Sequence, residues 1–124
     1  MNEATFDTGA LLALERRKQR MTKIHRTMLD DGVPMVVPGV CIAEWWRGRT
    51  DWREEILSSV LIVHTDDELM KLAGKALVAV PEATTIDAIV MATAAMRSGV
   101  VFTSDVDDLM ALQRVFPRVR VLSV

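Results

Sequence analysis

Residues 60–68 read Val60-Leu61-Ile62-Val63-His64-Thr65-Asp66-Asp67-Glu68, and this stretch decides the fold class. Its first four residues form an unbroken apolar run, which is typical of a strand buried on both faces of a parallel sheet. Thr65 and Glu68 then have the spacing of a capping box, which predicts that a helix begins directly after the strand. Because parallel strands are joined by helical crossovers, the stretch predicts an α/β fold.

Strand and helix signals alternate in the same way along the rest of the chain. Further strands are expected at 5–7, 33–37 (interrupted by Pro34), 100–103 and 119–122. Further helices are expected at 15–29, 50–59 and 106–115, from Pro38-Gly39 through Trp46, and from Thr84 or Thr85 to Arg97. Gly32 and Gly99 suit the positions just after two of these helices, and Pro81 ends the helix that starts at the capping box. This order predicts a three-layer α/β/α sandwich around a mostly parallel sheet.

The length of 124 residues suits a single domain that spans 1–124. A chain of this size buries roughly two-thirds of its surface, which provides a core without disulfides or a structural metal. Cys41 is the single cysteine, so an internal disulfide and a CxxC site are excluded. The first residues lack the pattern of a signal peptide, and the apolar run 88–96 is too short to span a membrane. We therefore expect a cytoplasmic protein without a membrane partner.

The charges of the chain nearly cancel, since 15 basic and 17 acidic residues give a net charge of −2. A near-neutral sum argues against a nucleic-acid-binding protein. The positions of the charges matter more than their sum, however, because acidic and basic residues are separated along the chain.

Four carboxylates stand next to segments that are expected to be buried. Asp7 ends the first strand, Glu44 lies in an apolar helical stretch, Asp87 begins an apolar helix, and Asp105 follows the strand at 100–103. Strand ends and helix starts meet at the carboxyl edge of a parallel sheet, where such folds bind their ligands. We therefore expect the four side chains to converge.

Each carboxylate also has a simpler explanation when it is taken alone. Asp7 and Asp105 are suitable N-caps for the helices that follow them. Asp87 is placed to interact with the dipole of its helix, and Glu44 is placed to pair with Arg47 or Arg49. These local roles remain open alternatives for the individual residues.

A cluster of four carboxylates must take up protons or bind cations. Two charges about 5 Å apart repel by roughly 3 kcal/mol at an effective dielectric constant of about 20. Carboxylate oxygens are the ligands that Mg²⁺ and Mn²⁺ prefer. Neither His25 nor His64 adjoins any of the four in sequence, which argues against zinc.

The four blocks, in this order and at this spacing, resemble the PIN-domain ribonucleases of the VapC toxin type. The blocks are Phe-Asp-Thr-Gly around Asp7, Ala-Glu-Trp-Trp around Glu44, Thr-Ile-Asp-Ala around Asp87, and Phe-Thr-Ser-Asp-Val-Asp-Asp-Leu around Asp105. The resemblance covers essentially the whole chain. One departure is Gly9, where many relatives carry a hydroxyl residue.

The resemblance implies a Mg²⁺- or Mn²⁺-dependent endoribonuclease that hydrolyses RNA phosphodiester bonds with metal-activated water. It places metal-binding acids at Asp7, Glu44, Asp87 and Asp105, with Asp108 as a further acid. Thr8 and Thr103 would support them through their hydroxyl groups. The resemblance also implies a toxin of a toxin–antitoxin pair, a cognate antitoxin protein and a homodimer.

Basic residues flank the acidic blocks and provide candidate contacts to RNA phosphates. Arg16, Arg17 and Arg20 lie in the stretch 15–26, and Arg47 and Arg49 follow Glu44. Taken alone, such groups are usually solvated helix faces. Beside an acidic metal site they also suit RNA, because phosphates need positive guides that carboxylates do not provide.

Three other classes of protein share parts of this pattern. A receiver-like phosphoacceptor domain needs an acid pair after its first strand and a late lysine, whereas Asp7 stands alone and no lysine follows Lys75. A Toprim-like site is suggested by Asp105-Val106-Asp107 but needs a glutamate where Asp7 stands. A PIN-fold module that binds RNA or protein without cleaving it remains the alternative.

Overall fold

The computed structural model describes residues 2–97 and 99–124. In this part of the chain, strands and helices alternate in the predicted order. The elements are β1 (Ala4–Phe6), α1 (Thr8–Glu15), α2 (Gln19–Asp31), β2 (Met35–Pro38), α3 (Gly39–Trp45), α4 (Asp51–Ser58), β3 (Leu61–Val63), α5 (Asp67–Ala79), α6 (Thr85–Met96), β4 (Val100–Thr103), α7 (Val106–Gln113) and β5 (Arg120–Ser123).

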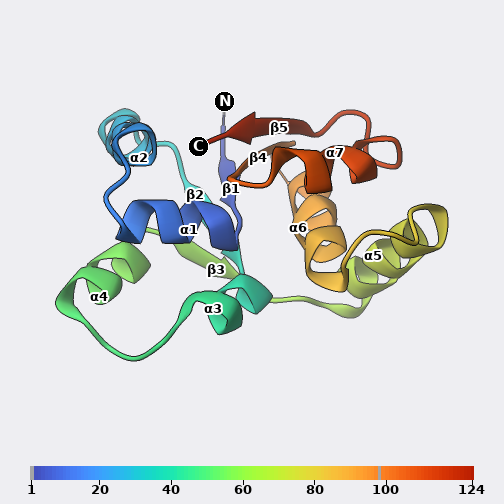
Figure 1. Ribbon diagram of the computed structural model, residues 1–124, viewed down its shortest axis with the longest axis horizontal. Helices are drawn as coiled ribbons and strands as arrows, with labels where there is room; N and C mark the ends of the chain where they lie inside the picture. Colours follow the sequence, from blue (N-terminus) through green and yellow to red (C-terminus); the bar gives the residue numbers. More distant parts are fainter. Residues whose placement is uncertain (1, 98) are drawn as a thin grey trace.

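The five strands form one parallel sheet in the order β3-β2-β1-β4-β5. Thr5 of β1 pairs with Val36 on one side and with Val101 on the other. Helices α1 to α4 lie on one face of the sheet and α5 to α7 on the other (Figure 1). The predicted three-layer α/β/α sandwich is therefore confirmed.

The strand order reverses between β1 and β4, because the chain first builds outward through β2 and β3 and then returns to the other side of β1. Open parallel sheets bind ligands at the carboxyl ends of the strands at such a reversal. The order also differs from the 2-1-3-4-5 order of receiver domains, which argues against that class.

The core is continuous through both helical layers. Phe6 of β1 and Phe102 of β4 meet edge to face, with ring centroids 5.9 Å apart. Helix α6 is the central helix of its layer, since every residue from Ala88 to Ala94 is buried. This explains why its sequence is apolar nearly all round.

Most predicted helix boundaries agree with the structure, because the residues expected to cap or end the helices do so. Gly32 ends α2 in the left-handed conformation (φ 66°), Thr50 caps α4, and Thr84 caps α6. Asp66 rather than Thr65 caps α5, because its carboxylate accepts the Leu69 amide. The helical stretch predicted from residue 15 is interrupted, since α1 ends at Glu15 and α2 begins only at Gln19.

The prediction that 60–63 is a strand buried on both faces is wrong. β3 is an edge strand, and Leu61 and Ile62 are 58% and 41% exposed. The unbroken apolar run indicates that the segment forms a strand. It does not indicate whether that strand lies in the centre or at the edge of the sheet. None of the helices within the described residues is long and apolar enough to cross a membrane.

Candidate functional site

Asp7 lies at the carboxyl end of β1, next to the reversal of strand order. Its side chain caps α1, because Oδ1 accepts the Ala10 amide at 2.9 Å. Burial raises the pKa of Asp7 from 3.8 to about 6, although hydrogen bonds from Thr103 and Ala10 oppose this. The charges of Asp87 and Asp105 raise the pKa further. Asp7 therefore caps α1, and it also belongs to the predicted carboxylate cluster.

Glu44 belongs to α3 and reaches toward the start of α1. The Thr8 hydroxyl donates a hydrogen bond of 2.6 Å to Glu44 Oε1. Pairing of Glu44 with Arg47 or Arg49 is not observed, because Arg47 bonds to backbone carbonyls and Arg49 pairs with Asp51. Thr8 thus fixes the position of a carboxylate that comes from another element.

Asp87 lies in the first turn of α6, where the Thr84 hydroxyl accepts its backbone amide at 3.1 Å. Burial raises the pKa of Asp87, and the negative charges of Asp108, Asp105 and Glu44 raise it further. This repulsion indicates that carboxylates from α3, α6 and the start of α7 face the same region.

Thr103 is the last residue of β4, and Asp105 follows it two positions later. The Thr103 hydroxyl is fully buried and accepts the Asp105 amide at 2.9 Å. Asp105 stands at the N-cap position of α7, but its side chain makes no capping hydrogen bond. The capping alternative is therefore wrong for Asp105, and its exposed carboxylate is free of that role.

The four predicted acids line one cavity of about 300 Å³, which we call the acidic cavity. Asp7, Glu44, Asp87 and Asp105 are joined in its lining by Thr8, Gly9, Leu12, Thr84, Ile86, Val90 and Ser104. Asp108 is exposed on α7 and is absent from this lining, although its charge acts on Asp87. Convergence of the four carboxylates agrees with their predicted positions at strand ends and helix starts.

Ser104 is a lining residue that the sequence analysis did not single out. A Cβ atom at Gly9 would stand 2.1 Å from Ser104 Oγ, so α1 approaches the end of β4 closely only because residue 9 is glycine. The signal that could have found Ser104 is its position in the sequence, between the end of β4 and Asp105.

The donors around the acidic cavity are suited to a hard divalent cation. All of them are carboxylate and hydroxyl oxygens, which is the chemistry that Mg²⁺ and Mn²⁺ prefer. The thiol of Cys41 is buried nearby, and burial raises its pKa to about 12, so it is unsuited as a ligand or nucleophile. Within the described residues, no group of three or more His, Cys, Asp or Glu side chains is arranged to hold a metal ion.

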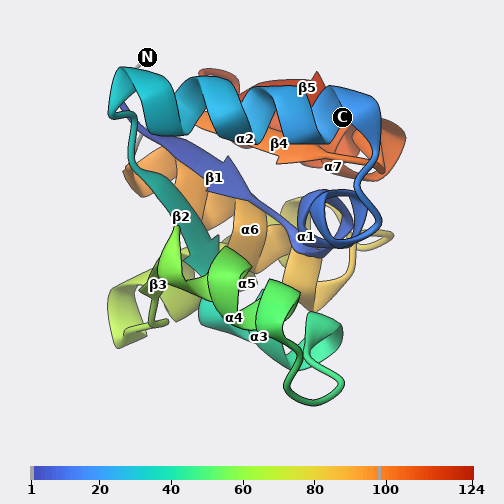
Figure 2. The same cartoon turned by 90° about the vertical axis from the view of Figure 1, so that its left-hand side faces the viewer.

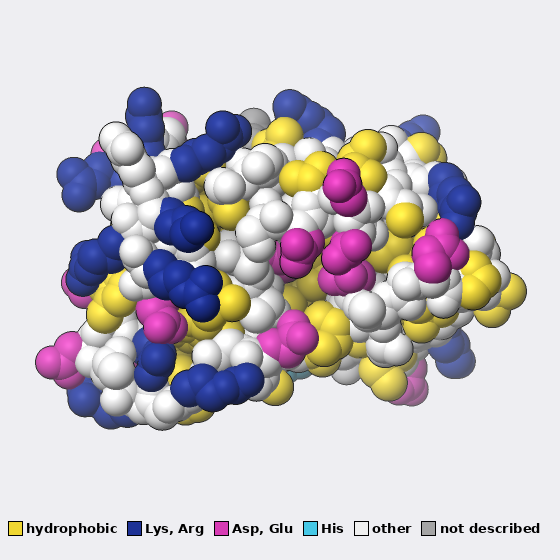
Figure 3. All heavy atoms as spheres, in the orientation of Figure 1, with side chains coloured by type: hydrophobic (Ala, Val, Ile, Leu, Met, Phe, Trp, Pro, Cys, Tyr) yellow, Lys and Arg dark blue, Asp and Glu magenta, His cyan; other side chains and the backbone are white. Residues whose placement is uncertain are grey.

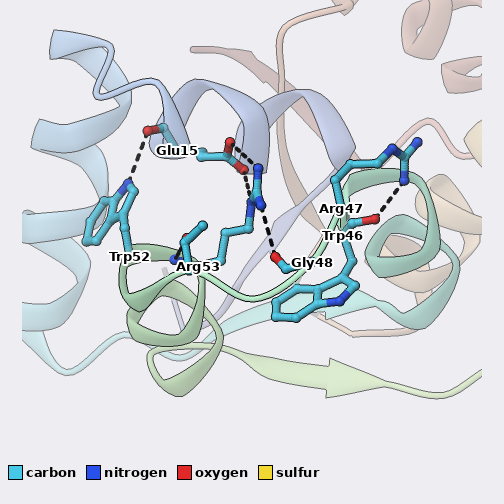
Figure 4. Close-up of polar contacts among 7 residues, drawn as sticks. Glu15, Trp46, Arg47, Gly48, Trp52 and Arg53 are labelled. Carbon is cyan, nitrogen blue, oxygen red and sulfur yellow. Dashed lines mark hydrogen bonds and ion pairs between the residues drawn. The ribbon is translucent and has the colours of Figure 1, made fainter.

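The predicted basic residues lie in α2 and in the segments that join α1 to α2 and α3 to α4, and none of them lines the acidic cavity. In Figure 3, Lys and Arg side chains gather on the left, whereas many Asp and Glu side chains lie near the middle and right. Arg16, Arg17 and Arg20 are exposed. Arg47 Nη1 donates to the Trp46 carbonyl at 2.7 Å (Figure 4). Arg49 pairs with Asp51, so both of these arginines already have partners.

Comparison with known proteins supports the fold alone. No protein-family model matches the chain, and no curated protein matches it. The chain is similar to the crystal structure of PAE2754 from Pyrobaculum aerophilum, with 23% sequence identity, 94% of each chain covered and a TM-score of 0.53. At this identity the likeness shows a shared architecture.

Proposed function

We propose that the chain is a Mg²⁺- or Mn²⁺-dependent endoribonuclease of the PIN-domain type. The observation that carries the proposal is the convergence of Asp7, Glu44, Asp87 and Asp105 on one cavity at the reversal of strand order. The order and spacing of the four sequence blocks support the same class.

The four carboxylates would hold the cation, and the surrounding hydroxyls would orient them. A divalent cation in such a site activates water and neutralises charge that develops on a phosphodiester. Asp7 is held rigidly, since it caps α1 and hydrogen-bonds with Thr103. Glu44 is held by Thr8, whereas exposed Asp105 has no capping bond that it must break in order to bind.

The proposal includes hydrolysis of RNA that leaves a 5′-phosphate. It also includes the biological setting that the resemblance implies: a cytoplasmic toxin, a cognate antitoxin that blocks the acidic cavity, and a homodimer. These parts rest on the resemblance of the sequence blocks alone.

The second candidate is a module of the same fold that binds RNA or protein without cleaving it. One observation favours it, because the described residues contain no group of three or more His, Cys, Asp or Glu side chains placed so that they could hold a metal ion. The two candidates differ in whether divalent cations produce cleavage.

A cleavage assay separates the two candidates. Purified chain, free of any partner, is incubated with total RNA in Mg²⁺, in Mn²⁺ and in EDTA, next to Asp7→Asn and Asp87→Asn. We expect cleavage in both cations, none in EDTA, and at least a hundredfold loss in either variant, since each removes a charged ligand.

Asp67→Asn is the matched control, because Asp67 is exposed at the start of α5 and does not line the acidic cavity. It is expected to cleave like the unmodified chain. Cleavage that persists in EDTA, or in both Asp7→Asn and Asp87→Asn, would contradict the proposal.

A further inference from the structure

Helix α1 carries a second anchor at the end opposite the acidic cavity. Thr8 and Glu15 are its first and last residues. Because they are almost two helical turns apart, their side chains lie on the same face, separated by roughly 10 Å along the helix axis. Helices α3 and α4 both lie below α1 in Figure 1 and in Figure 2. Thr8 bonds to Glu44 of α3, whereas Glu15 does not line the acidic cavity.

Glu15 ties the end of α1 to α4 and to the segment that joins α3 to α4 (Figure 4). Arg53 of α4 donates to both carboxylate oxygens of Glu15, from Nε at 3.0 Å and from Nη2 at 3.1 Å. Arg53 Nη1 donates to the Gly48 carbonyl at 2.9 Å. The Trp52 indole donates to the backbone carbonyl of Glu15 at 3.1 Å. One guanidinium therefore joins α1, α4 and the segment that follows α3.

The geometry of this ion pair distinguishes it from an ordinary surface pair. The Arg53 and Glu15 side chains are only 19% and 24% exposed. The hydrogen bonds from Arg53 hold the pKa of Glu15 below its usual value, so the carboxylate stays charged. A guanidinium that meets a carboxylate with two parallel bonds fixes direction as well as distance. The pair is therefore suited to orienting the elements that it joins.

Trp45 brings this network next to Glu44. It directly follows Glu44 in α3, and it is 1% exposed. After the larger effect of Arg53, the Trp45 indole also lowers the pKa of Glu15, which places the indole beside that carboxylate. Trp45 Nε1 nevertheless has no hydrogen-bond partner of ordinary geometry among the described residues. Glu15 thus lies close to the neighbour of Glu44 and, through Arg53, is bonded to the segment after α3.

Helix α3 depends on such contacts, because little within the helix fixes its position. It has seven residues, and isolated helices shorter than about 12 residues are marginal in water. Its N-cap residue, Pro38, makes no capping hydrogen bond, and its buried residues are Cys41 and Trp45. The Glu44 side chain is exposed, so packing does not orient it. The placement of Glu44 therefore depends on what holds α3 from outside.

We propose that Glu15 is a positioning residue for the acidic cavity, because together with Arg53 it holds the end of α3 so that Glu44 faces the other three carboxylates. Thr8 orients the Glu44 carboxylate, and Glu15 fixes the backbone that carries it. The inference rests on the proposed function, since it assigns to the proposed cation site a residue that lies outside the cavity.

A purely structural role would make this pair one of several that stabilise the fold. The pair of Glu3 and Arg97 is a matched comparison, because Arg97 also donates to both carboxylate oxygens of its partner. Arg97 is the C-cap residue of α6, at the end opposite Asp87, and neither Glu3 nor Arg97 lines the acidic cavity. Loss of either pair is expected to lower the melting temperature, but only loss of the Glu15 pair should affect Glu44.

The test measures Mn²⁺ affinity by isothermal titration calorimetry at pH 7, well below the melting temperature of every variant, so that only the folded state contributes. Glu15→Gln removes the charge at nearly constant size. We expect it to weaken Mn²⁺ binding about tenfold, as loss of a group that orients a metal ligand does. Glu3→Gln should leave the affinity unchanged even if it melts at an equally reduced temperature.

A double-mutant cycle shows whether Glu15 acts through Glu44. Glu44→Ala removes the ligand that Glu15 is proposed to position, so adding Glu15→Gln to Glu44→Ala should cause no further loss of affinity. A merely structural effect would weaken binding equally in both backgrounds. Equal losses in the two backgrounds, or full affinity in Glu15→Gln, would overturn the proposal.

Arg53→Lys tests the same pair from its other side and serves if Glu15→Gln does not fold. Lysine keeps the positive charge but lacks the planar fork that contacts both oxygens of Glu15 and the Gly48 carbonyl. We expect weaker Mn²⁺ binding that again requires Glu44. Full affinity in folded Arg53→Lys would contradict the proposal.

The outcomes separate this inference from the proposed function. If the unmodified chain binds Mn²⁺ and cleaves RNA, but Glu15→Gln does both equally well, the inference fails and the proposed function stands. If the unmodified chain binds no Mn²⁺, both fail.

Discussion

Asp7 carries two roles that act in opposite directions on stability. Its carboxylate caps α1, which stabilises the helix, and it is buried among other carboxylates, which destabilises its charged form. Asparagine caps a helix about as well as aspartate and carries no charge. The two roles are therefore separable by one substitution.

We predict that the metal-free protein loses stability as the pH rises through the range of the Asp7 titration. The pKa of Asp7 is about 6 in the folded chain and near 3.8 when unfolded. Between these values the folded state binds more protons than the unfolded state, so the free energy of unfolding falls as the pH rises. The expected loss is roughly 2–3 kcal/mol between about pH 4 and pH 7.

Urea unfolding in EDTA at several pH values measures this effect. Asp7→Asn should flatten the pH dependence and raise the stability at pH 7, whereas Asp67→Asn should leave the curve as it is. An equally steep curve in Asp7→Asn would show that other groups cause the dependence.

At the residue scale, the sequence indicates which carboxylates converge but not what holds them. Strand ends and helix starts meet at one sheet edge, so Asp7, Asp87 and Asp105 were placed correctly by topology alone. The Thr8–Glu44 hydrogen bond joins residues 36 positions apart, and no local pattern encodes such a contact. The contact between Gly9 and Ser104 is equally non-local.

At the element scale, β3 shows that an apolar pattern does not predict the position of a strand within its sheet. A run of four apolar residues is typical of a strand, but its neighbours in the sheet are decided by the whole chain. β3 has β2 on one side and no strand on the other among the described residues. Its apolar side chains are therefore largely exposed.

We predict that β3 tolerates truncation much better than the core. Leu61 is 58% exposed and Leu112 is fully buried. Leu61→Ala should change the free energy of unfolding by less than about 1 kcal/mol, whereas Leu112→Ala should cost about 2–5 kcal/mol. Denaturant unfolding of the two variants checks this, and a large loss in Leu61→Ala would mean that β3 is covered in solution.

The break between α1 and α2 could not be predicted from periodicity. Apolar residues continue at helical spacing through Met21 and Ile24, and Arg17 is not a residue that normally ends a helix. The hydrogen bonds from the Arg17 and Lys18 amides to Leu14 and Ala13 nevertheless close α1 in the usual left-handed manner. Packing of α2 across the end of α1 overrides the local preference.

At the scale of the whole molecule, the proposed cation site in the acidic cavity predicts that stability depends on divalent cations. We predict that Mg²⁺ or Mn²⁺ raises the melting temperature at pH 7 by several degrees, because a ligand that binds only the folded state stabilises it. The shift should be lost in Asp87→Asn. The measurement is a thermal melt with NaCl at equal ionic strength as the control, and an equal shift in NaCl or in Asp87→Asn would contradict it.

The uneven distribution of charge gives this nearly neutral molecule a side rich in bases and a separate acidic cavity. Many of its bases gather on the side of α1, α2 and α4 (Figure 3), whereas four of its acids line the acidic cavity at the ends of β1 and β4. A polyanion that approaches at long range therefore meets an attractive and a repulsive side, despite a net charge of −2. In the field of the polyanion, the protein rotates so that its basic side faces the polyanion before contact. The encounters are therefore oriented, and the association rate falls as salt screens the charges.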